Sequence, residues 1–276
     1  MKGLILLFKF MTRLPIPMNP EFDSKELGKS MKFFPVVGIV IGLILYLVYY
    51  IGAKFIMSSY LLAGIVVTTE VILTGALHLD GLADTFDGIF SYRSKQKMLE
   101  IMKDSRLGTN GGIVLILYFL LKIMLIAGIN DMSLGFIGNI MGVKSAVGAV
   151  LIVTPVLARI NSVLNCTVSP YAKASGSAKE FVDNTDKNGL LIATAIGLLF
   201  AAIVGCGIMK VLNPVHLINI TAVSMILGLY FAKLMEKKIG GITGDTLGAV
   251  LELSEIVILF GFYFSLASEL GKQFSL

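Results

Sequence analysis

The sequence predicts an all-α integral membrane protein, a polytopic helical bundle of about seven transmembrane helices with an interfacial helix at its N-terminus. Of the 276 residues, 56% are hydrophobic and only 15% are charged, whereas a soluble domain has about 25% charged residues. The mean hydropathy is +0.86. Nearly uncharged runs of about 20 residues, the length that crosses a bilayer, recur along the chain. These observations exclude a disordered chain and an ordinary soluble globule.

The apolar runs predict the elements in order. The first ten residues are too short to span, Pro15 and Pro17 follow them, and no small-residue cleavage site is present. They predict an interfacial or re-entrant helix and not a signal peptide. Seven longer runs predict spans in a single domain that covers residues 1–276. These spans cover residues 33–53, 60–79, 111–129, 134–158, 188–209, 211–232 and 246–268.

Lysine and arginine are distributed unevenly between the connections. Eighteen of the 23 lie in residues 1–32, 80–110, 159–187 and 233–245, which fall on one side of the predicted spans. The other side has Lys54, Lys210 and Lys272. Because positive loops stay in the cytoplasm, we expect a multi-pass protein of the cell membrane with its N-terminus and active site cytoplasmic and its C-terminus outside. These loops also explain the net charge of +5, so no nucleic-acid partner is expected.

Three aspartates mark the cytoplasmic end of the second predicted span. Asp80, Asp84 and Asp87 lie within about 60° of one another on a helical wheel, so they share one face. Like charges at this spacing repel, and they repel more strongly at a low-dielectric boundary. A divalent cation removes the repulsion, and Mg²⁺, bound by a few carboxylates and substrate phosphates, suits such a site. We therefore predict a metal site here, with a solvated acidic helix end as the alternative.

A second acidic group opens the last predicted span. Asp245 and Glu252 are seven residues apart on one helical face, with Glu255 further round. The stretch that leads into them, residues 240–248, is rich in glycine and would allow the close approach of a ligand or a neighbouring helix. We predict a ligand or metal role for this group, with pairing between helices as the alternative.

Two more charged residues are candidates for contact with a substrate. Glu70 would lie roughly 15 Å deeper than Asp80 on a continuous helix, and an acid within a span is costly and often functional. It could instead pair with Lys122 or Lys144, which also lie within spans. Arg159 stands at a predicted span end, where it could contact a phosphate or extend to the interface.

The stretch between the second and third spans combines cations with glycines. Lys103 and Arg106 flank Asp104, and Gly108 and Gly111 lead into the next helix. Cations and a glycine-rich turn at a helix N-terminus form an anion-binding arrangement, although no Walker A pattern occurs. Beside a magnesium site, this stretch predicts a phosphate clamp.

Several blocks, in order and nearly from end to end, point to one family. They are residues 12–17 (TRLPIP), 34–35 (FP) with Gly38 and Gly42, 74–88 (TGALHLDGLADTFDG), 100–109 (EIMKDSRLGT), 170–172 (PYA) and 240–249 (GGITGDTLGA). In these blocks the chain resembles cobalamin synthase, the adenosylcobinamide-GDP ribazoletransferase family of membrane enzymes. Two positions depart from the pattern: Lys173 stands where arginine is expected, and Ala76 where glycine is common.

The resemblance implies a reaction and its cofactor. A ribose hydroxyl of alpha-ribazole, or of its 5'-phosphate, attacks the activated phosphate of adenosylcobinamide-GDP, GMP leaves, and adenosylcobalamin or its 5'-phosphate forms. Mg²⁺ is the implied cofactor, and a wide cytoplasmic-facing cavity is expected for the corrinoid. The metal ligands would be Asp80, Asp84 and Asp87. The catalytic residues would be Asp84, Asp87 and Asp245. The residues in contact with substrate or phosphate would be Lys103, Asp104, Arg106, Arg159, Glu70 and Glu252.

Two other functions are alternatives. A CDP-alcohol phosphotransferase also has aspartates at helical spacing, but its pattern needs arginine where Asp84 follows Ala83. A cation-coupled transporter would suit charges within spans, but the acids crowd one face instead of the midplane. The expected partners are the lipid bilayer and the two small-molecule substrates, and a homo-oligomer is left open.

Overall fold

The structure, a computed structural model, describes residues 2–136, 143–176, 178–209 and 213–274. In this part of the chain every regular element is a helix, and one isolated bridge joins Tyr171 to Ile242. The helices are α1 (Lys2–Met11), α2 (Ser24–Lys29), η1 (Ser30–Phe33), α3 (Phe34–Gly52), α4 (Ser59–Thr74), α5 (Leu77–Ile89), α6 (Lys95–Ile101), α7 (Thr109–Phe136), α8 (Val143–Val168), α9 (Lys179–Asp183), α10 (Lys187–Ala201), η2 (Ala202–Ile208), α11 (Pro214–Ile239) and α12 (Gly244–Phe274).

The predicted all-α membrane bundle is confirmed. Six helices among the described residues are long and apolar enough to cross a membrane, and α4 with α5 qualifies as a seventh, broken span. The fourth predicted span, 134–158, was wrongly placed: its first residues belong to α7, residues 137–142 lie outside the described residues, and α8 continues to Val168. Arg159 therefore lies within a long helix and not at its end.

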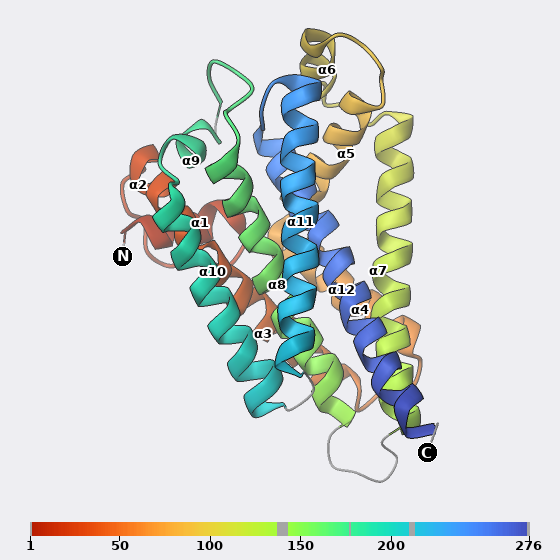
Figure 1. The fold of residues 1–276 in the computed structure, drawn as a ribbon. Coiled ribbons are helices and arrows are strands. Elements are labelled where there is room, and N and C mark those ends of the chain that lie inside the picture. The colour runs from red at the N-terminus through yellow and green to blue at the C-terminus, as the bar shows by residue number, and fades with distance from the viewer. Residues whose placement is uncertain (1, 137–142, 177, 210–212, 275–276) are drawn as a thin grey trace.

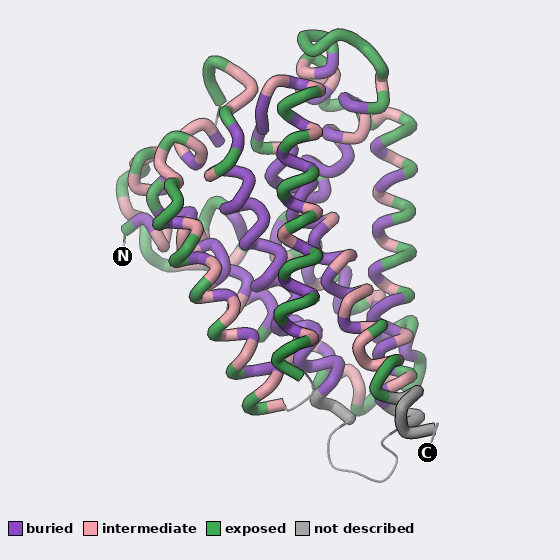
Figure 2. Tube along the Cα trace, in the orientation of Figure 1, coloured by how far each residue is buried: buried purple, intermediate pink, exposed green. Residues whose placement is uncertain are grey.

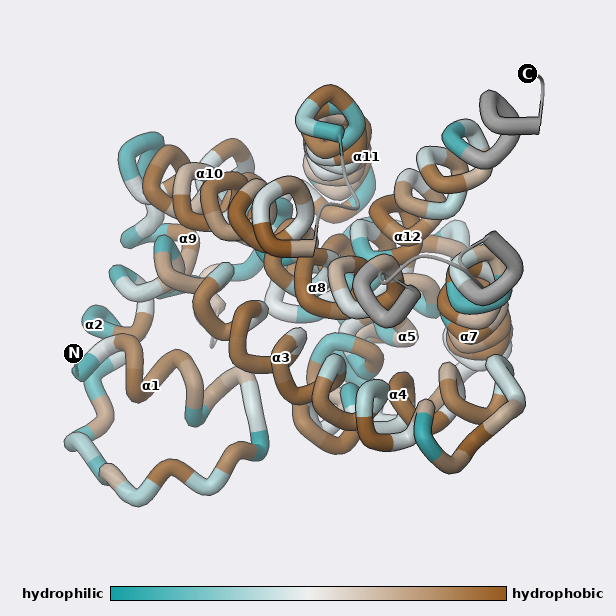
Figure 3. The backbone as a smooth tube through the Cα atoms, turned by 90° about the horizontal axis from the view of Figure 1, so that it is seen from below, coloured by the Kyte–Doolittle hydropathy of each residue, from teal (hydrophilic) through white to brown (hydrophobic). Residues whose placement is uncertain are grey.

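Helix α8 is the core of the bundle. Its residues 146–166 are all buried (Figure 2), and α3, α10, α11 and α12 pack around it, as the view along the bundle shows (Figure 3). Helix α3 comes closest because glycine faces α8 at two positions. A Cβ atom on Gly38 would lie 2.5 Å from the Pro155 carbonyl oxygen, and one on Gly42 would lie 2.6 Å from that of Ile152. Such small-residue contacts are typical of helix packing in membranes.

The second predicted span is not one helix. Helices α4 and α5 are bent by 91° at Gly75 and Ala76, both of which have a left-handed backbone (φ 62° and 58°). The backbone N–H of Arg13 donates to the Leu73 carbonyl at 2.7 Å and so satisfies one of the carbonyls at the end of α4. The aspartates therefore stand on a separate helix that turns away from Glu70.

Three of the four segments predicted to share a side gather at one end of the bundle. In Figure 1 the segments around α5 and α6, around α9, and between α11 and α12 all gather toward the upper end, and the C-terminus lies at the opposite end. Helix α1 packs with α2 and η1 against the start of α3, and it buries Leu6, Leu7 and Met11. The fold thus collects the predicted site residues of α5, of the α6–α7 connection and of α12 at one end.

Candidate active site

The close crossing of α5 and α12 builds the candidate site. A Cβ atom on Gly81 would lie 2.5 Å from the Asp245 carbonyl oxygen, and one on Gly248 would lie 2.9 Å from that of His78. Glycine at both positions therefore brings the backbones together and sets Asp80 and Asp84 of α5 beside Asp245 of α12. The structure thus unites acids that are more than 150 residues apart in the sequence.

Negative charge is concentrated at this crossing. Asp80 is exposed and Asp84 is half-buried on α5, and Asp245 of α12 stands beside them at the crossing. Lys173, from the loop after α8, lies 3.7 Å from Asp245 Oδ2 and partly offsets this negative charge. Since like charges at a partly desolvated site destabilise one another, the site favours a further cation.

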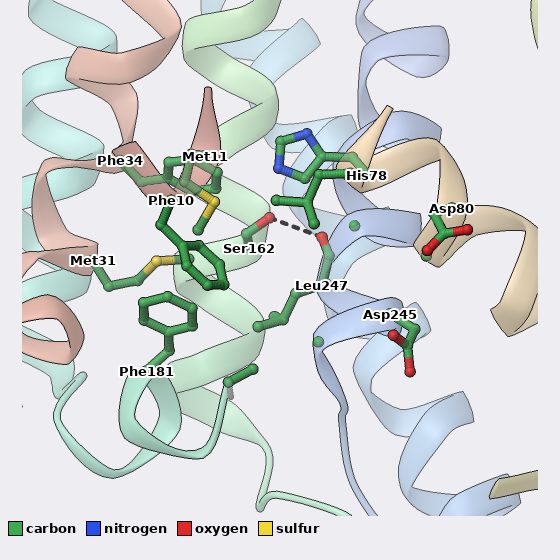
Figure 4. A pocket seen from close by; sticks show the side chains of 15 residues that line it. Phe10, Met11, Met31, Phe34, His78, Asp80, Ser162, Phe181, Asp245 and Leu247 are labelled. Atoms are coloured by element: carbon green, nitrogen blue, oxygen red, sulfur yellow. Dashed lines mark hydrogen bonds between the residues drawn. The ribbon is translucent and has the colours of Figure 1, made fainter. Parts of the chain in front are cut away.

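A small cavity lies beside the acids (Figure 4). Its volume is about 110 Å³. Asp80 and Asp245 stand at one side of it, and apolar side chains, among them Phe10, Phe34 and Phe181, stand at the other. Pockets for drug-sized ligands have roughly 300–1,000 Å³, so this cavity is too small to enclose a corrinoid. The wide cavity expected for the corrin ring is not present at this place.

Asp87 has partners that the sequence did not indicate. Its two carboxylate oxygens accept hydrogen bonds from the backbone N–H groups of Gly108 and Gly111, both at 2.8 Å. These donors stand at the N-terminus of α7, where N–H groups lack partners within the helix and a negative charge is favoured. Asp87 therefore ties the α6–α7 connection to α5. A role for Asp87 as a metal ligand stays a prediction, and this geometry favours anchoring of the loop.

We expect Asp87→Asn to act through the loop and not through the predicted metal site. An amide offers one acceptor oxygen in place of two, so one charge-assisted hydrogen bond of about 1.5–3 kcal/mol is lost. The variant should show a lower unfolding temperature and faster proteolysis between residues 102 and 108. Its Mg²⁺ concentration for half-maximal turnover should match that of the wild type. A shifted Mg²⁺ requirement at unchanged stability would instead make Asp87 a metal ligand.

The remaining acids fit a magnesium ion that substrate oxygens help to hold. In the part of the chain that the structure describes, no three acidic, histidine or cysteine side chains converge enough to enclose a metal ion. Asp80, Asp84 and Asp245 nevertheless supply hard oxygen donors beside a glycine-lined crossing. Mg²⁺ is usually bound by one or two carboxylates together with water and substrate phosphates. The donor set therefore fits this ion.

The predicted phosphate clamp is exposed. Lys103 is exposed, and Arg106 pairs with Asp104 through its Nε at 2.9 Å and its Nη2 at 2.5 Å. Hydrogen bonds from the side chain and the backbone of Arg106 lower the pKa of Asp104 to about 2. The Arg106 side chain is 87% exposed, so its guanidinium remains accessible to an anion.

Glu70 and Glu252 lie in the interior of the bundle and not at the crossing, so their contact with substrate stays a prediction that this placement does not favour. Both are buried between helices of the bundle. Lys122 of α7 lies 2.7 Å from Glu70 of α4 and also donates to Glu255 of α12. The Tyr118 hydroxyl donates to Glu252 and accepts from Lys122 at 2.6 Å. These acids pair between helices, which is the alternative given above for Glu70 and for the acids of α12. The side chain of Lys144, the other predicted partner of Glu70, is not among those that the structure describes.

Arg159 belongs to the same buried network, and its contact with a phosphate stays a prediction that this burial does not favour. Its side chain is 0% exposed, and its Nη1 lies 3.7 Å from Glu255 Oε1. Its guanidinium also stands over the Phe34 ring, 5.3 Å from the centroid. His78 is the link between the network and the cavity, because it lines the cavity and its Nδ1 lies 4.0 Å from Glu252 Oε1.

Comparison with known proteins identifies the family. The family model described as cobalamin-5-phosphate synthase matches residues 3–263. The chain belongs to this family. A curated relative from Fusobacterium nucleatum, named adenosylcobinamide-GDP ribazoletransferase, is 49% identical over 95% of this chain and 97% of its own length. Relatives of the same name from Clostridioides difficile (39% identical; 95% and 97%) and Caldanaerobacter subterraneus (37%; 96% and 98%) are also similar. No solved structure matches.

Membership of the cobalamin-5-phosphate synthase family confirms the resemblance drawn from the sequence blocks. The match is nearly end to end, so it includes α5, the α6–α7 connection and α12, which build the candidate site. It favours an enzyme over a cation-coupled transporter. It also favours this enzyme over a CDP-alcohol phosphotransferase, in agreement with Asp84 at the position where that pattern requires arginine.

Proposed function

We propose that this chain transfers the adenosylcobinamide phosphate group from adenosylcobinamide-GDP to alpha-ribazole or its 5'-phosphate and releases GMP. The family and the names of its relatives make it a transferase of cobalamin synthesis. The structural observation that carries the proposal is the glycine-lined crossing of α5 and α12, which gathers Asp80, Asp84 and Asp245 beside a cavity. An end of the bundle that carries both oxygen donors and exposed cations suits a diphosphate substrate.

The reaction needs positioning and charge neutralisation more than covalent chemistry. The O–H bond of the ribose hydroxyl breaks, a new P–O bond forms, and the P–O bond to GMP breaks. Asp80, Asp84 and Asp245 would hold Mg²⁺, which when bound supplies positive charge to the diphosphate. Lys103 and Arg106 contact phosphate oxygens at the mouth of the site, Asp104 orients Arg106, and Asp87 fixes the loop that carries them.

The proton of the attacking hydroxyl needs an acceptor within the site. Asp245 suits this role as an alternative to metal binding, because it is only partly exposed and its carboxylate stands at the cavity. Its Oδ2 also accepts a hydrogen bond from Thr243 Oγ1 at 3.1 Å, which restricts its orientation. With the active site on the cytoplasmic face of the cell membrane, as the positive loops indicate, soluble nucleotide substrates would reach it from the cytoplasm.

Purified full-length protein in detergent tests the proposal. With adenosylcobinamide-GDP, alpha-ribazole and Mg²⁺, we expect GMP and a cobalamin product in equal amounts, and no GMP when a chelator removes divalent ions. A parallel reaction with a CDP-alcohol and an alcohol acceptor should release no CMP. Folded protein that releases no GMP, or that releases CMP, would contradict the assignment.

A further inference from the structure

The loop after α8 is fixed against the start of α12. The backbone N–H of Ala172 donates to the Ile242 carbonyl at 2.8 Å, and the N–H of Ile242 donates to the Pro170 carbonyl at 2.9 Å. Gly241 makes this bridge possible: its φ is +147°, and a Cβ atom there would overlap the Pro170 carbonyl oxygen. Lys173 therefore directly follows a backbone bridge to Ile242, which lies two positions before the first residue of α12 and three before Asp245.

The Lys173 side chain extends into the acidic crossing. Its Nζ lies 3.7 Å from Asp245 Oδ2, and the side chain is only 16% exposed. The same ammonium also attracts the carboxylate of Asp84 on α5. Lys173 is thus a cation placed among acids of two helices. At 3.7 Å its contact with Asp245 is an ion pair beyond ordinary hydrogen-bond length, so a better partner can displace it.

We propose that Lys173 is a diphosphate-binding residue that Asp245 holds in place until the substrate arrives. When the substrate binds, the ammonium leaves Asp245 for a phosphate oxygen, and the Asp245 carboxylate becomes available to the metal ion or to the attacking hydroxyl. Lysine suits such an exchange because it is a point charge with three donors on a flexible stem, whereas arginine prefers one planar, bidentate geometry. The inference rests on the proposed function for the identity of the diphosphate.

The exchange predicts effects of opposite sign on two ligands. Without substrate, Lys173 and a divalent cation compete for Asp245, so removal of the ammonium should strengthen binding of the cation. With substrate, the ammonium contributes to phosphate binding, so its removal should weaken binding of adenosylcobinamide-GDP. A lysine that only stabilises the loop would change neither affinity in this way.

The experiment uses full-length protein in detergent and compares wild type with Lys173→Met and Lys173→Gln. Mn²⁺ alone is titrated and followed by electron paramagnetic resonance, which requires no turnover. We expect the apparent Kd for Mn²⁺ to fall about two- to fivefold, the equivalent of a partly exposed ion pair. The KM for adenosylcobinamide-GDP should rise about tenfold or more, as for loss of a hydrogen bond to a charged group.

Lys179→Met is the matched control, because Lys179 forms an exposed ion pair with Asp183 on the neighbouring helix α9. It should leave both affinities unchanged. Unchanged or weaker Mn²⁺ binding in the two Lys173 variants would overturn the competition, and an unchanged KM would overturn the diphosphate contact. If the wild type released no GMP, the proposed function would fail while the Mn²⁺ titration still tested the competition at Asp245.

Discussion

Asp84→Asn is expected to lower turnover by about 10²–10³-fold, the usual effect of removing one group that stabilises transition-state charge. Asp84 is the half-buried member of the acidic group, and the charges of Asp80, Asp87 and Asp245 act on it. The substitution removes one of the three carboxylates proposed to hold Mg²⁺. It also relieves repulsion between carboxylates, so the unfolding temperature should stay equal to that of the wild type or rise. A stability gain with an activity loss is the pattern of a functional residue.

GMP release and thermal unfolding are measured on the same preparation, over a range of Mg²⁺ concentrations. Glu100→Gln is the control, since it removes one negative charge from the exposed Lys97–Glu100 pair on α6 at the same end of the bundle. It should leave turnover and the Mg²⁺ requirement unchanged. Full turnover of Asp84→Asn in Mg²⁺ would show that Asp84 is not a ligand of the proposed metal ion.

Features that depend on local periodicity could be predicted from the sequence. The apolar runs gave most of the spans, and the spacing of Asp80, Asp84 and Asp87 placed them on one helix. The bend at Gly75 and Ala76 could not be predicted in this way. It depends on a left-handed alanine and on a hydrogen bond from Arg13, about 60 residues earlier in the chain, and no proline marks it.

Contacts between distant helices account for most of the differences. In the sequence Asp87 has the same helical spacing as the other two aspartates. In the structure, however, the backbone N–H groups of Gly108 and Gly111 donate hydrogen bonds to both of its carboxylate oxygens. Arg159 suggested a span end because a charge within a span is costly. In the structure Glu255, 96 positions later, lies against it and makes burial possible. In the sequence Lys173 is noted only as a lysine where arginine is expected, and the bridge between Ala172 and Ile242 is what places it beside Asp245.

Lys122→Met should destabilise the protein by about 3–5 kcal/mol, the cost of removing one partner from a buried ion pair. Lys122 is 4% exposed, lies 2.7 Å from Glu70 and also donates to Glu255 and Tyr118. Methionine fills a similar volume but leaves these acids without their shared cation, and Arg159 reaches only one of them, Glu255, at 3.7 Å. We expect a clear fall in the temperature of unfolding in detergent and a lower yield of folded protein.

Lys97→Met provides the matched control for this substitution. Lys97 forms an ion pair with Glu100 that is 2.9 Å long and exposed on both sides, and such pairs contribute about 0–1 kcal/mol. The same chemical change should therefore have little effect there. If both variants lost the same amount of stability, burial would not increase the contribution of the Lys122 ion pairs to the stability of the protein.

The double variant Lys122→Met/Glu255→Gln separates the network's effect on stability from any effect on catalysis. Removing one acid together with its cation should recover part of the lost stability, since Glu70 is then the only one of the two acids paired with Lys122 that is left without its cation. His78 and Glu252 connect the network to the cavity. If the network only holds α4, α7, α8 and α12 together, the double variant should regain turnover along with its unfolding temperature. Recovered stability with turnover still low would instead show that the buried charges position His78 and α12 for the reaction.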